Sequence, residues 1–304
     1  MKIATHNGKF HADEVMATAI LMDLFPEATL LRTRDRNVIE AADIAVDVGG
    51  GCFDHHQRGG NGARANGVAY SSIGLIWIDY GRRYLYEVTR RMFGDMIDSD
   101  AVGRIKAKVD ETIIQELDMV DNGVIKGKER MATCLSNVIG AMNCGWLPAA
   151  MSESEDVRFR RAQVTALQFL NDTIEGLCLK ELAVMMLERD IQESPGEILL
   201  LGQFYPWQET LAQKEHGYKL CVFGSGADWK IQTIQDFDTE GVGKTRMYLP
   251  EEWAGLQNEQ LQEVTQVSGA TFCHNGRFIG GASSKEAALA MAHLAISLEK
   301  HAWC

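Results

Sequence analysis

The first fifty residues alternate short apolar stretches that suit strands with a longer amphipathic stretch that suits a helix. Residues 2–5 and 28–33 favour strands, and 42–48 favours a third strand, which ends in three glycines. Between the first two, 11–25 carries apolar side chains at helical spacing and stops before Pro26. Strands and helices that alternate in this way predict a parallel sheet with crossover helices.

The chain is mostly helical up to residue 195 and richer in strands afterwards. Helices are expected over 73–97, 101–120, 131–140 and 156–189. Short β-favouring runs are then expected within 197–201, 219–224, 229–234 and 270–279, before a final helix over 285–299. The sequence therefore predicts an α/β protein with a parallel-sheet domain over 1–150, a helical connector over 151–195 and a smaller C-terminal α+β domain over 196–304.

Composition and charge narrow the class of protein. The 304 residues include 30 Lys and Arg against 42 Asp and Glu, for a net charge of −12. This balance disfavours broad, non-specific binding to duplex nucleic acid but leaves room for a small or metal-bridged phosphate ligand. No apolar run is long enough for a membrane span, and the N-terminus has no signal-peptide core. Seven scattered cysteines without a C-x-x-C motif predict free thiols, so we expect a cytoplasmic protein without a membrane partner.

Imidazole and carboxylate side chains gather where the predicted strands end. Ligands of parallel α/β sheets bind at this carboxyl edge, and a mixture of imidazole and carboxylate suits Mn²⁺. The pattern predicts a divalent-metal site, although a strand-end aspartate such as Asp47 could instead cap a helix. The side chains of this cluster are His6, His11, Asp13, Glu14, Asp47, Asp54, His55 and His56.

Seven motifs resemble a known family in their order. D-H-H at 54–56, after a strand that ends V-D-V-G at 46–49, resembles the DHH phosphoesterase superfamily. The longer series resembles the melanocyte-proliferating-gene protein family, described as metal-dependent protein hydrolases or 3′–5′ RNA exonucleases. The resemblance extends from residue 3 to about 295 and implies that the N-terminal domain is of the DHH type. The motifs are T-H-N-G-K-F-H-A-D-E at 5–14, R-T-R-D at 32–35, V-D-V-G-G at 46–50, D-H-H-Q at 54–57, Y-S-S-I-G-L-I-W at 70–77, V-D-N-G at 120–123 and F-I-G-G at 278–281.

The resemblance implies a centre of two Mn²⁺ ions, with Mg²⁺ or another divalent metal as alternatives. Asp47 is implied as the bridge between the ions and as a catalytic residue together with His56, which would lie against the substrate phosphate. The superfamily has an aspartate four residues after the first histidine, where this chain has Phe10, so His11 is taken as the ligand there. Asp118 is an alternative to Asp121. The implied ligands are His6, His11, Asp13, Asp47, His55 and Asp121.

Substrate-binding residues are expected in two parts of the chain. Arg32 and Arg34 could reach a phosphate from the end of the second strand, or could be solvated surface charges. A Gly280-Gly281 turn ahead of the last helix would leave N–H groups open to an anion, or could simply join a strand to a helix. The resemblance implies that the smaller domain closes over substrate with His274, Arg277, Gly280, Gly281 and Lys285.

These features predict a Mn²⁺-dependent phosphoesterase, with 3′–5′ exonuclease action on short RNA as the leading hypothesis. Two metal ions would lower the pKa of a shared water and neutralise charge on the phosphoryl oxygens. One alternative is a small-molecule phosphoesterase of the pyrophosphatase or cyclic-dinucleotide type. Another is a non-catalytic, metal-binding regulatory protein. Protein hydrolysis is disfavoured because no peptide pocket is indicated, and a homodimer is possible from the apolar helices.

Overall fold

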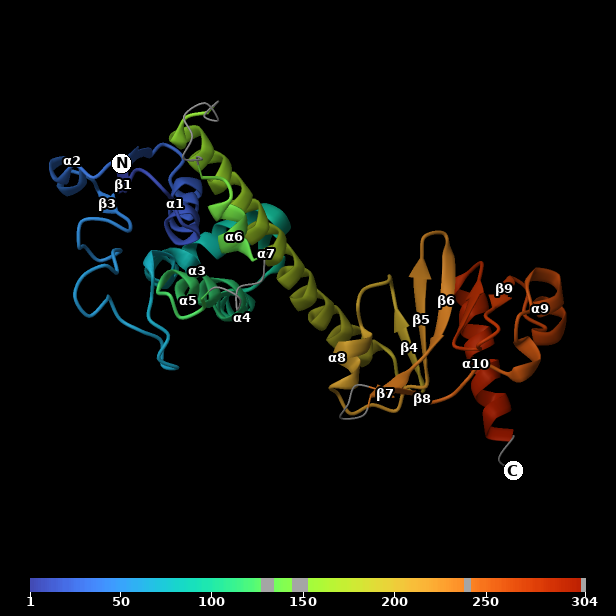
Figure 1. The fold of residues 1–304 in the computed structure, drawn as a ribbon. Helices are drawn as coiled ribbons and strands as arrows, with labels where there is room; N and C mark the ends of the chain where they lie inside the picture. Colours follow the sequence, from blue (N-terminus) through green and yellow to red (C-terminus); the bar gives the residue numbers. More distant parts are fainter. Residues whose placement is uncertain (127–133, 144–152, 238–241, 302–304) are drawn as a thin grey trace. The chain divides into compact units, whose positions relative to one another are not determined.

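The computed structural model describes residues 1–126, 134–143, 153–237 and 242–301 (Figure 1). The chain divides into two compact units, Met1–Leu179 and Lys180–Cys304. The division falls within helix α7 (Glu155–Glu193), inside the segment 151–195 that was expected to connect two domains. The expected mixture of helices with a parallel sheet is confirmed, and each unit is described here by itself.

A three-stranded parallel sheet begins the first unit (Figure 1). Its order is β2-β1-β3, and its strands are β1 (Lys2–Thr5), β2 (Thr29–Arg32) and β3 (Ile44–Ala45). Because β1 is central, Ile3 lies opposite Leu30 on one side and Ile44 on the other. Parallel strands of this kind place their carboxyl ends at one edge of the sheet.

The third strand is shorter than the 42–48 expected from the sequence. β3 covers two residues, and beyond it a separate bridge joins Val46 to Phe53. The backbone of Asp47 then takes up a left-handed conformation, with φ of 60°, which ends the extended run. Asp47 is therefore displayed at the end of the strand rather than within it.

Helices supply most of the first unit. Ten of the 13 residues of α1 are buried, as expected for a helix that is apolar on all sides and belongs in a core. α1 packs against α3. The helical elements of this unit are α1 (Ala12–Leu24), α2 (Arg36–Glu40), α3 (Ser72–Phe93), η1 (Gly94–Met96), α4 (Ser99–Val109), η2 (Asp110–Ile114), α5 (Gln115–Asp121), α6 (Leu135–Gly140) and the first part of α7. Residues 131–133 of the helix expected over 131–140 lie outside the described residues.

One π-helical turn, η2, interrupts the helix expected over 101–120. The N–H of Gln115 donates to the carbonyl of Asp110, five residues earlier. α4 leads into this turn and α5 follows it directly. Because a π-turn holds more residues than an α-turn, it rotates α5 about the helix axis relative to α4. That rotation sets the direction of Asp118 and Asp121 on α5.

The second unit contains a five-stranded sheet of order β4-β5-β6-β10-β9. β4 is parallel to β5 and the other pairs are antiparallel, so the hairpin expected between 219 and 234 is present as β5 and β6. No helix in the described ranges of the chain has both the length and the apolar character needed to cross a membrane. The elements are β4 (Ile198–Leu201), α8 (Gln208–Ala212), β5 (Leu220–Ser225), β6 (Asp228–Thr233), β7 (Gln235–Phe237), β8 (Gly243–Thr245), η5 (Glu251–Trp253), α9 (Asn258–Thr265), β9 (Ala270–Cys273), β10 (Ile279–Ala282) and α10 (Lys285–His301).

The two faces of this sheet bury different cores. On β5, Leu220 and Val222 join the core that includes Met291 of α10. Cys221 and Phe223, which point to the opposite face, join the core that includes Leu187 of α7. The alternation follows from the two-residue period of a strand, and it explains why β5 is apolar along most of its length.

The Gly280-Gly281 pair lies in strand β10, so the expectation of a turn there is wrong. Gly281 is opposite Lys230 of β6 on one side and Phe272 of β9 on the other. A Cβ at position 281 would overlap the Phe272 ring, which accounts for a glycine inside a strand. Since β10 has a partner on each side, its N–H groups belong to the sheet and do not form an open anion site.

Candidate metal centre

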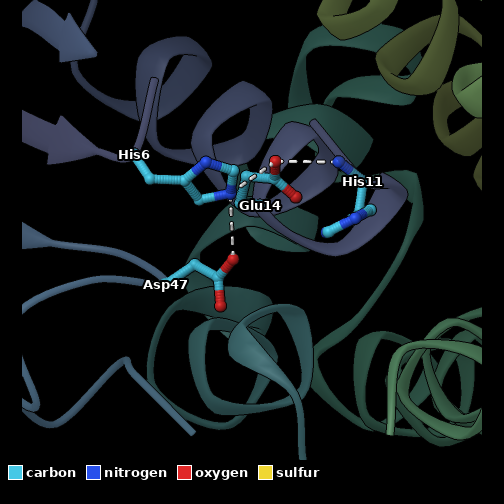
Figure 2. A group of neighbouring side chains, drawn as sticks. All are labelled: His6, His11, Glu14 and Asp47. Carbon is cyan, nitrogen blue, oxygen red and sulfur yellow. Dashed lines mark hydrogen bonds and ion pairs between the residues drawn. The ribbon is translucent and has the colours of Figure 1, made fainter. Parts of the chain in front are cut away.

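The candidate ligands lie at the carboxyl edge of the first sheet. His6 directly follows β1, and Asp47 follows β3 by two residues. Figure 2 shows the His6 ring pointing at the carboxylates of Glu14 and Asp47. The loop from His6 to His11 leads into α1, whose first turn carries Asp13 and Glu14. The strand-end rule therefore predicts the location of this cluster correctly.

His6 is oriented by its own backbone neighbour. Its Nδ1 lies 3.1 Å from the carbonyl oxygen of Asn7, so an Nδ1–H can donate there and leave the Nε2 lone pair facing inward. Nε2 lies 3.0 Å from Glu14 Oε1 and 3.3 Å from Asp47 Oδ2. A histidine held through one ring nitrogen and presented through the other is typical of metal sites.

His55 is held in the same way from the opposite side. Its Nδ1 lies 3.3 Å from Asn122 Oδ1, while the Asn122 amide nitrogen donates to two backbone carbonyls that fix its orientation. His55 Nε2 is 3.0 Å from Asp121 Oδ2, 3.3 Å from Asp47 Oδ1 and 4.0 Å from Asp13 Oδ2. Three carboxylates therefore surround one imidazole nitrogen.

Asp47 lies between the two histidines. Oδ2 faces His6 and Oδ1 faces His55, and Oδ1 also accepts a 3.0 Å hydrogen bond from Ser72 Oγ. The left-handed backbone at Asp47 is strained for a residue other than glycine, and such strain is concentrated at functional sites. Its two-sided contact is the arrangement that a bridging carboxylate requires.

Several polar atoms buried in this cluster have no hydrogen-bond partner among the described residues. They are both carboxylate oxygens of Asp13, Oε2 of Glu14 and Nε2 of His55. A buried carboxylate without donors is strongly unfavourable unless a cation compensates it. Three overlapping groups in the described chain could hold such a cation, and the imidazole and carboxylate donors fit Mn²⁺ or Mg²⁺. The groups are His6, His11, Glu14 and Asp47; Asp47, His55 and His56; and His11, Asp13 and Asp121.

The pKa values show how strongly the cluster attracts positive charge. Burial alone lowers the pKa of His6, but hydrogen bonds with Asp47 and Glu14 outweigh it and raise the pKa to about 10. Burial alone would also lower the pKa of His55, but the contacts with Asp121 and Asp47 outweigh it and raise the pKa to about 10. Burial and the neighbouring carboxylates raise the pKa of Asp13 well above its ordinary value. Without metal, protons bound by this cluster compensate part of its negative charge.

The ligand set expected from the sequence omits Glu14. This carboxylate is fully buried, and its Oε1 accepts a 2.8 Å hydrogen bond from the backbone N–H of His11. A glutamate three residues after a helix start is typical of a capping box, and that spacing is the available signal. Its contact with His6 depends on the tertiary fold and has no counterpart in the local sequence.

The two more exposed histidines lie at the border of the cluster. The side chain of His11 is 54% exposed, and its Nδ1 is 3.8 Å from Asp121 Oδ1. The side chain of His56 is 63% exposed, and its Nδ1 is 2.9 Å from Asp54 Oδ1 and 3.3 Å from Asp47 Oδ1. Asp54 also accepts hydrogen bonds from the N–H groups of Gly50 and His56, so it shapes the glycine-rich loop.

Asp118 does not belong to this cluster, so the alternative to Asp121 is not supported. Its Oδ1 accepts from the N–H and the hydroxyl of Ser71 and from the N–H of Gly74. Its Oδ2 pairs with Arg64 at 2.6 Å. These donors satisfy the carboxylate, whereas Asp121 faces His55.

Arg32 is neither a solvated charge nor open to a ligand. Its side chain is 4% exposed, and its guanidinium donates to the carbonyl of Gly8 at 2.7 Å and to Asp156 at 2.9 Å. The same group lies 4.4 Å from the centre of the Phe159 ring. Arg32 therefore holds the loop that carries His6, while Arg34 is exposed.

A cavity of about 810 Å³, called cavity 1, opens over the cluster. Its wall includes His6, Asp47 and His56 together with two exposed cations, Lys9 and Arg34. Neither cation forms an ion pair within the described parts of the chain. Cations without a carboxylate partner beside an anionic metal site suit a phosphate ligand.

In the second unit, the expected basic residues lie against aromatic rings. The Arg277 guanidinium is 5.3 Å from the centre of the Tyr248 ring, and Arg277 has a left-handed backbone with φ of 57°. The His274 ring is 4.5 Å from that of Phe278. Lys285 Nζ lies 5.9 Å from the Trp229 ring. A role for these side chains in substrate binding stays a prediction.

Comparisons with known proteins find relatives along nearly the whole chain. The family model MYG1_exonuc, described as Uncharacterised protein family (UPF0160), matches residues 2–296. The MYG1 protein of Schizosaccharomyces pombe is 32% identical over 99% of both chains, and the Homo sapiens protein named MYG1 exonuclease is 32% identical over 97% of this chain and 86% of its own. RecJ from Thermus thermophilus, solved with Mg²⁺, aligns with a TM-score of 0.27 and 13% identity over 99% of this chain and 50% of that chain, too weakly to support a conclusion. The chain therefore belongs to the MYG1 family, as the order of its motifs indicates.

Proposed function

We propose that this chain is a phosphoesterase that uses two Mn²⁺ ions to hydrolyse phosphodiester bonds of short RNA from the 3′ end. The observation that carries the proposal is the buried carboxylate of Asp13, which has no hydrogen-bond donor among the described residues and forms a group of candidate metal ligands with His11 and Asp121. The name of the human relative, MYG1 exonuclease, supports action at the end of a nucleic acid.

The residues of the first unit supply a complete donor set for two ions. When bound, the ions would provide a hydroxide near neutral pH and neutralise charge on the phosphoryl oxygens. Asp47, with one oxygen toward each histidine, is the residue suited to bridge them. The residues that would hold the ions are His6, His11, Asp13, Glu14, Asp47, His55 and Asp121.

The chain's own groups would position the substrate and move the proton. Lys9 and Arg34 line cavity 1 and can bind non-bridging phosphate oxygens. An Nδ1–H of His56 that donates to Asp54 leaves Nε2 available in the same cavity. When Nε2 also carries a proton, His56 can give the Nε2 proton to the leaving oxygen, while the contact of Nδ1 with Asp54 orients the ring.

The proposal is tested with a five-nucleotide RNA labelled at its 5′ end, incubated with purified protein and Mn²⁺. We expect a ladder that shortens from the 3′ end, stops with EDTA and is reduced at least about 100-fold by His55→Ala. His293→Ala is the matched control, because His293 is an exposed histidine of α10 in the second unit.

The outcome also separates the proposed activity from its alternatives. Intact RNA alongside hydrolysed pyrophosphate or cyclic dinucleotide would identify a small-molecule phosphoesterase. Tight Mn²⁺ binding without hydrolysis of any of these substrates would identify a binding protein. Cleavage that EDTA and His55→Ala leave unchanged would contradict a metal-dependent reaction at this centre.

A further inference from the structure

A second cavity adjoins the metal centre on the other side of His11. This cavity, called cavity 2, has a volume of about 450 Å³. It shares Lys9 and His11 with cavity 1, and Asp13 and Asp121 lie in its wall. The two cavities therefore meet at the candidate ligands. A phosphate bound there would have cavity 1 on one side and cavity 2 on the other.

Cavity 2 differs from cavity 1 in chemistry. Phe10, Leu117 and Val120 contribute apolar surface to its wall, and Ser136 and Asn137 of α6 contribute polar groups. Ser136 is half-buried, and its hydroxyl makes no hydrogen bond within the described chain. The wall thus combines apolar surface with several polar and charged groups. Its volume lies within the range of about 300–1,000 Å³ that is typical of pockets for small organic ligands.

The same wall disfavours a second phosphate. Lys9, shared with cavity 1, is the only cation among the residues that line cavity 2 in the described chain. The carboxylates of Asp13 and Asp121 face the boundary with the metal centre and would repel an unshielded phosphate. An uncharged, partly aromatic group with hydroxyls fits this composition, whereas pyrophosphate does not.

We propose that cavity 2 binds the terminal nucleoside of the substrate while the adjoining phosphate lies at the metal centre. The inference rests on the proposed function and specifies its substrate class. A cavity of this volume holds one small organic ligand and not a polymer, so the chain end enters it and the remaining chain extends from the other flank. Cleavage from an end, rather than within a strand, follows from that limit.

Gly140 allows cavity 2 to be filled without disturbing the metal centre. This residue ends α6, lines the cavity and has a backbone conformation open to all residues. A Cβ at 140 would meet no atom within 4 Å. Gly140→Leu therefore adds side-chain volume to the cavity. Gly176→Leu is the matched control, because Gly176 is an exposed glycine of α7 whose Cβ would also meet open space.

The experiment measures binding of inorganic phosphate and of adenosine 5′- and 3′-monophosphates to Mn²⁺-loaded protein by calorimetry. For the parent and Gly176→Leu, we expect one of the two nucleotides to bind at least about tenfold more tightly than phosphate. Gly140→Leu should remove this difference and leave the affinities for phosphate and Mn²⁺ unchanged. Ser136→Ala should weaken binding of the same nucleotide by about two- to tenfold, as expected for the loss of one neutral hydrogen bond.

The outcomes distinguish this inference from the proposed function. Equal affinities for phosphate and both nucleotides in the parent would overturn the nucleoside site, even if RNA were hydrolysed. A nucleotide preference that survives Gly140→Leu would place the nucleoside elsewhere and also overturn it. A parent that binds neither Mn²⁺ nor phosphate would instead contradict the proposed function itself.

Discussion

Asp13→Asn should change stability in opposite directions with and without metal. Asp13 is 1% exposed, and neither of its carboxylate oxygens has a hydrogen-bond donor among the described residues. Burial raises the pKa of Asp13, and the neighbouring Asp47, Glu14 and Asp121 raise it further. Its negative charge therefore destabilises the metal-free protein. The amide of asparagine has nearly the same shape, carries no charge and can donate to the neighbouring carboxylates.

The size of both effects can be worked out. An unpaired buried charge costs several kcal/mol, and uptake of a proton limits that cost, so we expect Asp13→Asn to raise the free energy of unfolding in EDTA by about 1–3 kcal/mol. In the parent, metal at 100 times its Kd adds about 2.7 kcal/mol. If the lost ligand weakens binding about 100-fold, the same metal concentration adds only about 0.4 kcal/mol to the variant.

Thermal unfolding in EDTA and in Mn²⁺ measures both effects, with calorimetry for the metal affinity. At about 2–4 °C per kcal/mol, metal should raise the Tm of the parent by about 5–10 °C and that of the variant by about 1 °C. Asp118→Asn is the matched control, because Asp118 is equally buried but its oxygens accept from Ser71, Gly74 and Arg64. It should destabilise the protein by about 3–5 kcal/mol in both conditions.

Two results would refute the reasoning about Asp13. One is a variant that is less stable than the parent in EDTA, because the carboxylate would then have a partner in the metal-free protein. The other is a metal-dependent rise in Tm equal to that of the parent, because Asp13 would then contribute nothing to metal binding.

Three further changes test separate features of the structure. Asp47→Asn should reduce RNA hydrolysis at least about 100-fold without adding backbone strain, because asparagine tolerates the left-handed backbone; unchanged hydrolysis would remove Asp47 from the mechanism. Gly74→Ala should lower the free energy of unfolding in urea by about 2–4 kcal/mol, because its Cβ would overlap the Asp118 carboxylate; the usual stabilisation of a helix by alanine would contradict this packing. Glu197→Gln should lower the free energy of unfolding by less than about 1 kcal/mol at pH 7. Ion pairs with Lys300 and a second lysine hold the pKa of Glu197 below its ordinary value of 4.5. The stabilisation is present above that ordinary pKa and lost as the pH falls through the lowered value, so parent and variant should converge in acid, and a difference that persists there would contradict the ion pairs.

The gathering of the candidate ligands at one edge of the sheet could be predicted from the sequence because it depends on strand order. His6 and Asp47 follow two strands of one parallel sheet, so their proximity follows from topology alone. The local pattern also predicts the helix that begins after His11. The orientation of the rings could not be predicted, because it depends on the carbonyl of Asn7 and the amide of Asn122.

Other features depend on contacts between segments that are distant in the sequence. A local interpretation of Arg32 cannot include its partners at Gly8 and Asp156, so it suggests either a phosphate ligand or a solvated charge. The Gly280-Gly281 pair is typical of a turn by composition, but the neighbouring Phe272 requires the missing side chain inside a strand. In both cases the tertiary partner overrules both local interpretations.

The π-helical turn at Asp110–Ile114 makes the centre sensitive to chain length. Deleting one residue from this turn would allow an ordinary α-helix to continue from α4 into α5, with little loss of helical structure. It would also rotate every later residue of α5 by about 100° around the helix axis. Asp121 would turn away from His55 and Asp118 away from Arg64, so a shortened chain would keep its helices while losing metal binding. The number of residues in this turn, rather than their identity, therefore constrains which insertions and deletions the enzyme can accept.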